Sequence, residues 1–172
     1  MIEVNKTQHS APSAPSAPSA PLAAGAVPRG CTHFRLRQLS RRVGQHYDQE
    51  MAQIGLKTTQ YSLLSHVLTL GPVAPGVLAR AMTMEASTLT RNLKPLIALG
   101  WVSLSAGADG RSRSVSITAA GRDKRAEAQR RWKVAQHSIN RLLGDTRVAA
   151  LHELLDESLH LLAPHDTGAD DE

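Results

Sequence analysis

The chain has 172 residues, enough for one globular domain with short appended segments. Its 41% hydrophobic content suits a mainly helical core, and its single cysteine excludes an intrachain disulfide. No apolar stretch approaches the roughly 18 residues that span a bilayer, so we expect a cytoplasmic protein without a membrane segment. The net charge of +5 is uneven, because residues 164–172 form an acidic tail with four carboxylates, whereas residues 31–163 carry 18 basic and 10 acidic side chains and suit a polyanionic partner.

Residues 1–30 form an N-terminal arm that contains four Ser-Ala-Pro repeats between positions 10 and 21. Proline fixes φ and removes backbone donors, and Ser and Ala offer little apolar surface to bury, so we expect this arm to be disordered. The arm lacks the basic region and long apolar run of a secretory signal. With so few charges, it is interpreted as an inert tail rather than as a segment that contacts a polyanion.

Two helices are predicted after the arm. The first covers Thr32–Ile54, where apolar side chains recur every three to five residues, and Gly55 provides its C-terminal stop. Its apolar residues are Phe34, Leu39, Val43, Tyr47, Met51 and Ile54. Thr58 or Thr59 can cap the second helix. This helix ends near Leu70, and because it is apolar on nearly all sides, it should be largely buried.

The most specific pattern of the chain lies in residues 75–118. It predicts a short helix over 76–82, a turn over 83–85, a second helix over 86–99 closed by Gly100, and two strands over 101–106 and 113–117. This order is that of a winged helix-turn-helix with a two-stranded β wing, a mainly α fold that places one helix in the major groove of DNA. We therefore assign residues 57–118 to a DNA-binding lobe.

The helix over 86–99 combines an apolar stripe with a polar face. The stripe, which should face the core, consists of Ala86, Leu89, Leu93, Leu96 and Ile97. The polar face, which should contact DNA, consists of Ser87, Thr88, Thr90, Arg91 and Lys94. Arg91 can donate two hydrogen bonds to O6 and N7 of guanine. The hydroxyls of Ser87 and Thr88 can contact bases or bind phosphate at the helix N-terminus, whereas Thr90 and Lys94 suit the DNA backbone. The alternative is an ordinary solvated helix face.

The tip of the predicted hairpin carries Asp109, Arg111 and Arg113. The flat, weakly hydrated head of arginine fits a narrow minor groove, so we expect this tip to contact DNA. Asp109 can accept a hydrogen bond from either arginine and fix its direction. It can equally serve the turn alone, since Asp-Gly is a strong turn former.

Two long helices are predicted after the hairpin. Thr118, or a residue beside it, can open the first, which runs to about Leu143, and Pro164 ends the second. Together with the N-terminal helix, they carry more apolar surface than a small winged-helix core can cover, and soluble proteins avoid leaving such a patch in water. We therefore expect a homodimer in which residues 31–56 and 119–163 pack against their symmetry mates.

The motifs ASTLTRNLKPLIALGWV and DGRSRSVSITAAG, together with the order of helices around them, resemble the MarR family of bacterial transcriptional regulators over roughly residues 31–163. The resemblance implies an obligate homodimer that binds a pseudo-palindromic operator in double-stranded DNA. It also implies regulation by a small aromatic effector, typically a phenolic or heteroaromatic carboxylate, whose binding releases the DNA from a repressor.

In this family the effector crevice lies between the dimerisation helices and the winged-helix lobe. The nearest candidates here are His33, Arg37, Arg41, Tyr61, Ser65 and His66. A cationic and aromatic lining suits a small planar anion. Alternatively, the arginines form surface or dimer ion pairs, and Tyr61 and His66 belong to the core.

A branch of the same family senses peroxide through a cysteine near the start of the first helix, where this chain has Cys31. His33 occupies the position where that cysteine is expected, and Arg37 stands in place of a tyrosine. Arg29 and Arg35 are close enough in sequence to lower the pKa of the thiol. A redox-sensing repressor based on Cys31 is therefore the alternative function.

Catalysis is not expected. Ser62, Ser65 and His66 are neighbours on one predicted helix, but no nucleophile elbow or oxyanion motif accompanies them. The eight histidines show neither HExxH nor a Cys/His metal spacing, so we expect neither a metal nor another cofactor.

Overall fold

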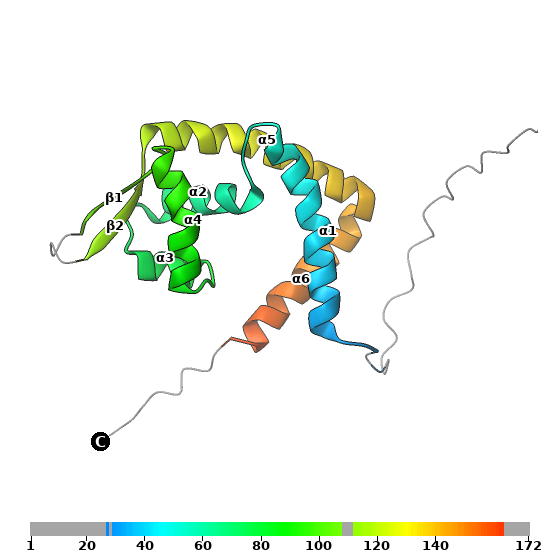
Figure 1. Cartoon of the computed structure of the whole chain (residues 1–172). Helices are drawn as coiled ribbons and strands as arrows, with labels where there is room; N and C mark the ends of the chain where they lie inside the picture. Colours follow the sequence, from blue (N-terminus) through cyan, green and yellow to red (C-terminus); the bar gives the residue numbers. More distant parts are fainter. Residues whose placement is uncertain (1–26, 28, 108–111, 164–172) are drawn as a thin grey trace, which may run out of the picture.

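The computed structural model describes residues 27, 29–107 and 112–163, so the arm through residue 26, Asp109, Arg111 and the acidic tail lie outside the described residues. The elements are α1 (Thr32–Ala52), α2 (Thr58–Leu70), α3 (Pro75–Ala81), α4 (Ala86–Ala98), β1 (Val102–Ala106), β2 (Arg113–Ile117), α5 (Ala119–Leu143) and α6 (Asp145–Leu161). In Figure 1, α2, α3, α4 and the hairpin form one lobe, α1 and α6 lie in a second, and α5 joins the two. The predicted mainly helical winged helix-turn-helix is confirmed. None of the helices in the described ranges is long and apolar enough to cross a membrane.

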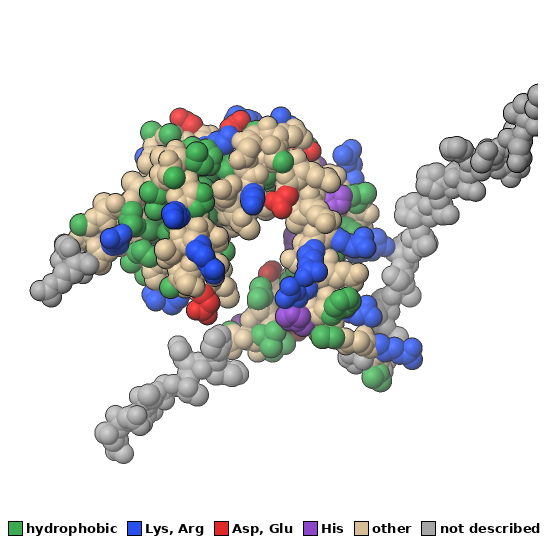
Figure 2. Space-filling view, viewed as in Figure 1, with side chains coloured by type: hydrophobic (Ala, Val, Ile, Leu, Met, Phe, Trp, Pro, Cys, Tyr) green, Lys and Arg blue, Asp and Glu red, His purple; other side chains and the backbone are tan. Residues whose placement is uncertain are grey.

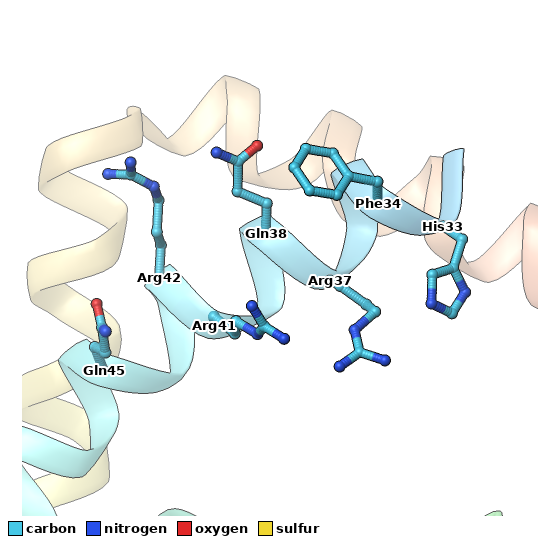
Figure 3. A pocket seen from close by; sticks show the side chains of 7 residues that line it. All are labelled: His33, Phe34, Arg37, Gln38, Arg41, Arg42 and Gln45. Atoms are coloured by element: carbon cyan, nitrogen blue, oxygen red, sulfur yellow. The ribbon is translucent and has the colours of Figure 1, made fainter. Parts of the chain in front are cut away.

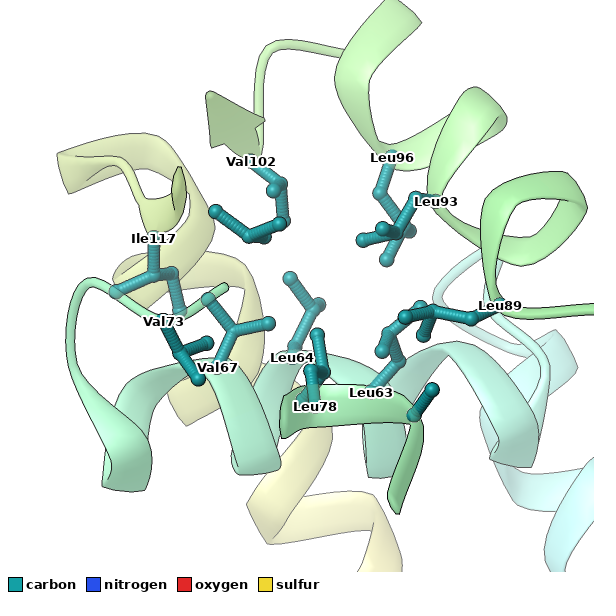
Figure 4. Close-up of a cluster of buried hydrophobic side chains, with 12 residues drawn as sticks. Leu63, Leu64, Val67, Val73, Leu78, Leu89, Leu93, Leu96, Val102 and Ile117 are labelled. Carbon is teal, nitrogen blue, oxygen red and sulfur yellow. The ribbon is translucent and has the colours of Figure 1, made fainter. Parts of the chain in front are cut away.

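The core of the winged-helix lobe lies where α2 meets α3, α4 and the hairpin (Figure 4). Its buried residues are Leu63, Leu64, Val67, Val73, Leu78, Ala79, Leu89, Leu93, Leu96, Val102, Val115 and Ile117. Each fully buried aliphatic side chain contributes about 1.5–3 kcal/mol, so this cluster is the main source of stability for the lobe. The prediction that α2 is largely buried is confirmed for Tyr61, Leu63, Leu64 and Val67, whereas Leu70 at its end is exposed.

Two residues of the predicted apolar stripe on α4 do not face the core. Leu89, Leu93 and Leu96 are buried as predicted, but Ala86 is exposed and the side chain of Ile97 is 37% exposed. The three leucines centre the stripe, and Ile97 follows Leu96 by about 100° around the helix, which turns it out of the contact. Ala86 is the first residue of α4 and lies beyond the edge of the packed surface.

The hairpin has the predicted alternation. Val102 pairs with Ile117 and Leu104 with Val115 in an antiparallel register, and both valines are buried. A further bridge joins Val73 to Val115, whose backbone groups exchange hydrogen bonds of 3.0 and 2.8 Å. The wing is therefore attached to the segment between α2 and α3 as well as to α5.

Two glycines end helices as the sequence predicts. Gly55 and Gly100 have φ values of +69° and +70°, in the left-handed region that L side chains rarely adopt. After each glycine the next N–H donates back five residues, from Leu56 to Met51 and from Trp101 to Leu96. This Schellman arrangement satisfies carbonyls that the helix end leaves free.

The N-terminus of α2 differs from the prediction, because neither Thr58 nor Thr59 is its capping residue. Lys57 holds the N-cap position, and its N–H donates to Gln60 Oε1 over 2.9 Å. The N–H of Thr58 donates to Asp48 Oδ1 of α1, also over 2.9 Å. A partner ten residues away thus supplies the acceptor that local capping rules assign to a threonine.

A second cluster joins α1, α2 and α5. Met51, Leu56, Tyr61 and Ala128 are buried together, with Trp132 packed against them. The N-cap of α5 is Thr118, as predicted, and its hydroxyl accepts from the N–H of Gly121 over 3.0 Å. The cluster and this cap fix the direction in which α5 leaves the winged-helix lobe.

Candidate nucleic-acid interface

The polar face of α4 is available to a partner. Ser87, Thr90, Arg91 and Lys94 are exposed, and Thr88 is half-buried. The buried leucines on the opposite side hold α4 against α2, so this face points away from the core. A helix anchored on one side and polar on the other is the arrangement that a groove-binding helix requires.

Two hydroxyls on this face already make local contacts. Thr90 Oγ1 donates to the carbonyl oxygen of Ala86 over 2.9 Å, and a guanidinium nitrogen of Arg91 donates to Thr88 Oγ1 over 3.3 Å. The first contact turns Thr90 toward its own helix and fits a role beside the groove. The second orients the guanidinium of Arg91 along the first turn of α4.

Arg113 is the one candidate of the wing tip within the described residues. It is exposed and pairs with Ala106 at the outer end of the hairpin, which projects from the lobe in Figure 1. The ion pairs within the described ranges are Lys124–Glu127 and Arg131–Glu50, so Arg91, Lys94 and Arg113 have no carboxylate partner there.

The three α1 candidates for an effector site line one shallow pocket of about 680 Å³. Its lining residues are His33, Phe34, Arg37, Gln38, Arg41, Arg42 and Gln45, all from α1. Figure 3 shows His33, Arg37 and Arg41 along one side, and Figure 2 shows basic side chains following this helix. None of the three arginines forms an ion pair with any described residue.

The three α2 candidates lie elsewhere, so the six residues do not line one pocket. Tyr61 is buried in the second cluster, with its ring 5.9 Å from the guanidinium carbon of Arg125. Ser65 Oγ accepts from Arg125 Nε over 3.2 Å, and His66 Nδ1 lies 2.8 Å from the carbonyl oxygen of Ser62. Tyr61 therefore has the core role that was the alternative for it.

Sequence reasoning missed an apolar groove of about 320 Å³ between α1, α5 and α6. Its lining residues are Leu36, Leu39, Ser40, Val43, Tyr47, Gln136, Ile139, Leu143, Val148, Leu151, His152 and Leu155. The hydroxyl of Tyr47 donates to Gln136, whose amide donates to Asn140 over 2.8 Å. Burial raises the pKa of Tyr47, so its hydroxyl keeps its proton at neutral pH. The apolar stripes of α1, α5 and α6 are visible in the sequence. The sequence does not show that these three stripes face one another within one protomer.

The chain is similar to several transcriptional regulators. A model of the MarR family matches residues 54–112. The chain is 31% identical to the regulator MOSR from M. tuberculosis, solved in complex with DNA, with 77% of this chain and 98% of that one covered and a TM-score of 0.65. A probable transcriptional regulator from Pseudomonas aeruginosa is 26% identical, with 73% and 95% covered and a TM-score of 0.68. The regulator YwoH of Bacillus subtilis is 30% identical over 84 residues, and the chain spans 61% of its length.

A helix held by buried leucines, with an exposed polar face and a projecting β hairpin beside it, defines the class of DNA-binding winged-helix transcriptional regulators. The chain belongs to the MarR family of these regulators. The relatives are described as transcriptional regulators rather than as enzymes, in agreement with the expectation that the chain is not a catalyst.

Proposed function

We propose that the protein is a homodimeric repressor that reads a pseudo-palindromic operator with α4 of each protomer. The observation that carries this proposal is the exposed face of Ser87, Thr90 and Arg91 opposite the buried leucines of α4. Arg91 contacts a guanine edge, Lys94 contacts phosphate, and Arg113 at the wing contacts the adjacent backbone or minor groove. Asp109 and Arg111 are proposed to act beside Arg113. The complex of the relative MOSR with DNA supports the same role for this lobe.

Exposed apolar side chains outside the winged-helix lobe support the dimer. The largest are Phe34 and Leu36 of α1, Leu142 of α5, and Leu154, Leu159 and Leu161 of α6, with Leu162 just after it. Leu36 also lines the apolar groove between the same three helices. A second copy of the chain covers such a surface in a closed, two-fold arrangement, which also matches the symmetry of a palindromic operator.

Selection of bound DNA tests this function and does not require a known operator sequence. Purified protein selects fragments of its source genome at about 0.15 M salt, where specific and electrostatic binding separate. We expect enrichment of fragments that share one inverted repeat. Enrichment that does not exceed that of bulk DNA contradicts sequence-specific regulation.

The pocket on α1 supports a small aromatic carboxylate as the effector. Arg37 and Arg41 are four residues apart on one side of α1 and have no carboxylate partner among the described residues. Phe34 also lines this pocket. Arginine binds carboxylates in a bidentate way, and an aromatic ring stacks on the apolar part of such a ligand. Ser65 and His66 are proposed to act only indirectly, from α2.

A panel of aromatic acids, added to the protein bound to its selected fragment, tests the effector. We expect at least one acid to release the DNA and to raise the melting temperature of the free protein. An Arg37→Gln, Arg41→Gln variant should lose both responses, whereas Arg141→Gln near the far end of α5 should keep them. If no acid changes the operator affinity or the melting temperature, the aromatic effector is abandoned.

The alternative redox function has one supporting observation, which is that Cys31 is exposed at the N-cap of α1. Organic hydroperoxide should then release the operator from the natural chain but not from a Cys31→Ser variant. An unchanged peroxide response in Cys31→Ser rules the redox function out.

A further inference from the structure

The start of α5 contacts the backbone of the residues that directly follow α4. Thr118 Oγ1 donates to the carbonyl oxygen of Gly100 over 2.7 Å, and the N–H of Thr118 donates to the carbonyl oxygen of Trp101 over 3.1 Å. One turn on, a Cβ at Gly121 would lie 1.9 Å from the same Trp101 oxygen. The junction between α4 and β1 therefore moves with the first turn of α5.

One side chain extends this contact to α1. Lys124 Nζ lies 5.6 Å from the ring centroid of Trp101, and it donates to the carbonyl oxygen of Ile54 over 2.7 Å. Ile54 belongs to the turn that follows α1. The same ammonium donates to Glu127 Oε2 over 2.9 Å. Lys124 thus forms an ion pair with Glu127 while it contacts Trp101 and Ile54.

The chemistry of lysine suits this position. Its ammonium has three donors, and two of them meet the carbonyl of Ile54 and the carboxylate of Glu127. The side chain of Lys124 is only 20% exposed, and a partly desolvated ammonium near an indole ring gains a cation–π attraction. An uncharged side chain of equal length would fill the space but lose all three interactions.

We propose that Lys124 is a positioning residue for DNA binding, which holds the α4–β1 junction at a fixed place relative to α1. The proposal rests on the DNA-binding function given above, because it concerns the orientation of α4 rather than a contact with DNA. Since α1 and α6 carry the proposed dimer surface, the Lys124 contacts set how each recognition helix is held relative to that surface.

Lys124→Met tests the proposal, with Lys133→Met as the matched control on the exposed side of the same helix. Loss of two charged hydrogen bonds and a cation–π contact should weaken operator binding by about tenfold. The dependence of binding on salt should keep its slope, because no phosphate contact is lost. Lys124→Arg should recover part of the affinity, and Lys133→Met should change neither quantity.

The fluorescence of Trp101, measured in a Trp132→Phe background, reports the contact without DNA. Lys124→Met should change the emission of Trp101, whereas Lys133→Met should not. If the emission changes but operator affinity stays within twofold of the parent, the positioning role is overturned. A salt slope that falls by about one per protomer would instead identify Lys124 as a phosphate contact. If the emission responds and the parent protein selects no operator, the Lys124 contact stands and the proposed DNA-binding function fails.

Discussion

Glu127 is the residue whose ionisation the structure changes most clearly among carboxylates in the described ranges. The hydrogen bond from Lys124 lowers the pKa of Glu127 from its ordinary value of 4.5, and the positive charges of Lys124, Arg130 and Arg131 act in the same direction. The pKa of Glu127 is lower in the folded chain than in the unfolded chain. The Lys124–Glu127 pair therefore stabilises the fold at pH values above the unfolded pKa. That stability disappears as pH falls through the folded pKa.

This sign gives a pH-dependent prediction. Glu127→Gln should be less stable than the natural chain at pH 7, and the difference in urea midpoint should shrink as the pH falls below 4.5 and through the lowered pKa of Glu127. Glu153→Gln, at an exposed site on α6, serves as the matched control and should show no such convergence. A difference that is independent of pH would mean that Glu127 acts through packing rather than through its charge.

Arg91 is the side chain on which base recognition is expected to depend. Arg91→Ala should weaken binding to the selected operator by about 1–3 kcal/mol and relax the preference at one base position per half-site. Fluorescence anisotropy with operators substituted at each position measures both effects. Arg141→Ala, which removes the same charge far along α5, should leave the base preference intact. Equal losses on every sequence would reassign Arg91 to the DNA backbone.

At the scale of elements, two glycines carry different constraints. Gly100 ends α4 at φ +70° with open space around a Cβ, so Gly100→Ala should cost about 1–2 kcal/mol from backbone strain alone. At Gly121 the backbone conformation is ordinary, but a Cβ meets the main chain of Trp101, which cannot rotate away. Gly121→Ala should therefore be the more destabilising change in urea unfolding at a fixed protein concentration. The reverse order would show that the first turn of α5 can move away from the α4–β1 junction.

The ends of the elements were predictable where local rules decide them. Gly55, Gly100 and Thr118 act as predicted because a helix end or cap depends on the nearest few residues. The cap of α2 was not predictable, since its acceptor is Asp48 on another helix. The exposure of Ile97 depends on how wide a strip of α4 the core covers, which periodicity does not specify.

The candidate DNA face was predictable for the same local reason, because it is the side of one helix opposite a stripe of leucines. The effector candidates were not, since they combine two helices whose relative placement depends on tertiary packing. His33, Arg37 and Arg41 share one pocket because they follow one side of α1. Tyr61 lies in a core that only the packing of α1, α2 and α5 creates.

For the whole molecule, α5 is the element that relates the two lobes. Its first turn contacts the end of α4, and its middle packs on Tyr61 and on Met51 at the end of α1. The ring of Trp132 packs near those of Tyr47 and Tyr61, with centroid distances of 6.5 Å to each. These contacts form a continuous packed route from α1 to the α4–β1 junction. Each step of that route is open to mutation.

The proposed dimer surface can be tested with residues that a single protomer leaves in water. The side chain of Leu159 is 69% exposed and that of Phe34 is 65% exposed, so aspartate at either position should not disturb the protomer fold. In a dimer that buries them, Phe34→Asp and Leu159→Asp place a charge in an apolar interface and should shift the protein to monomers in sedimentation velocity. Leu99→Asp, at a side chain 55% exposed on the winged-helix lobe, is the matched control and should stay dimeric. Because the proposed palindromic operator would engage α4 of both protomers, the monomeric variants should also lose most of their operator affinity. Variants that remain dimeric at micromolar concentration would place the interface elsewhere on the molecule.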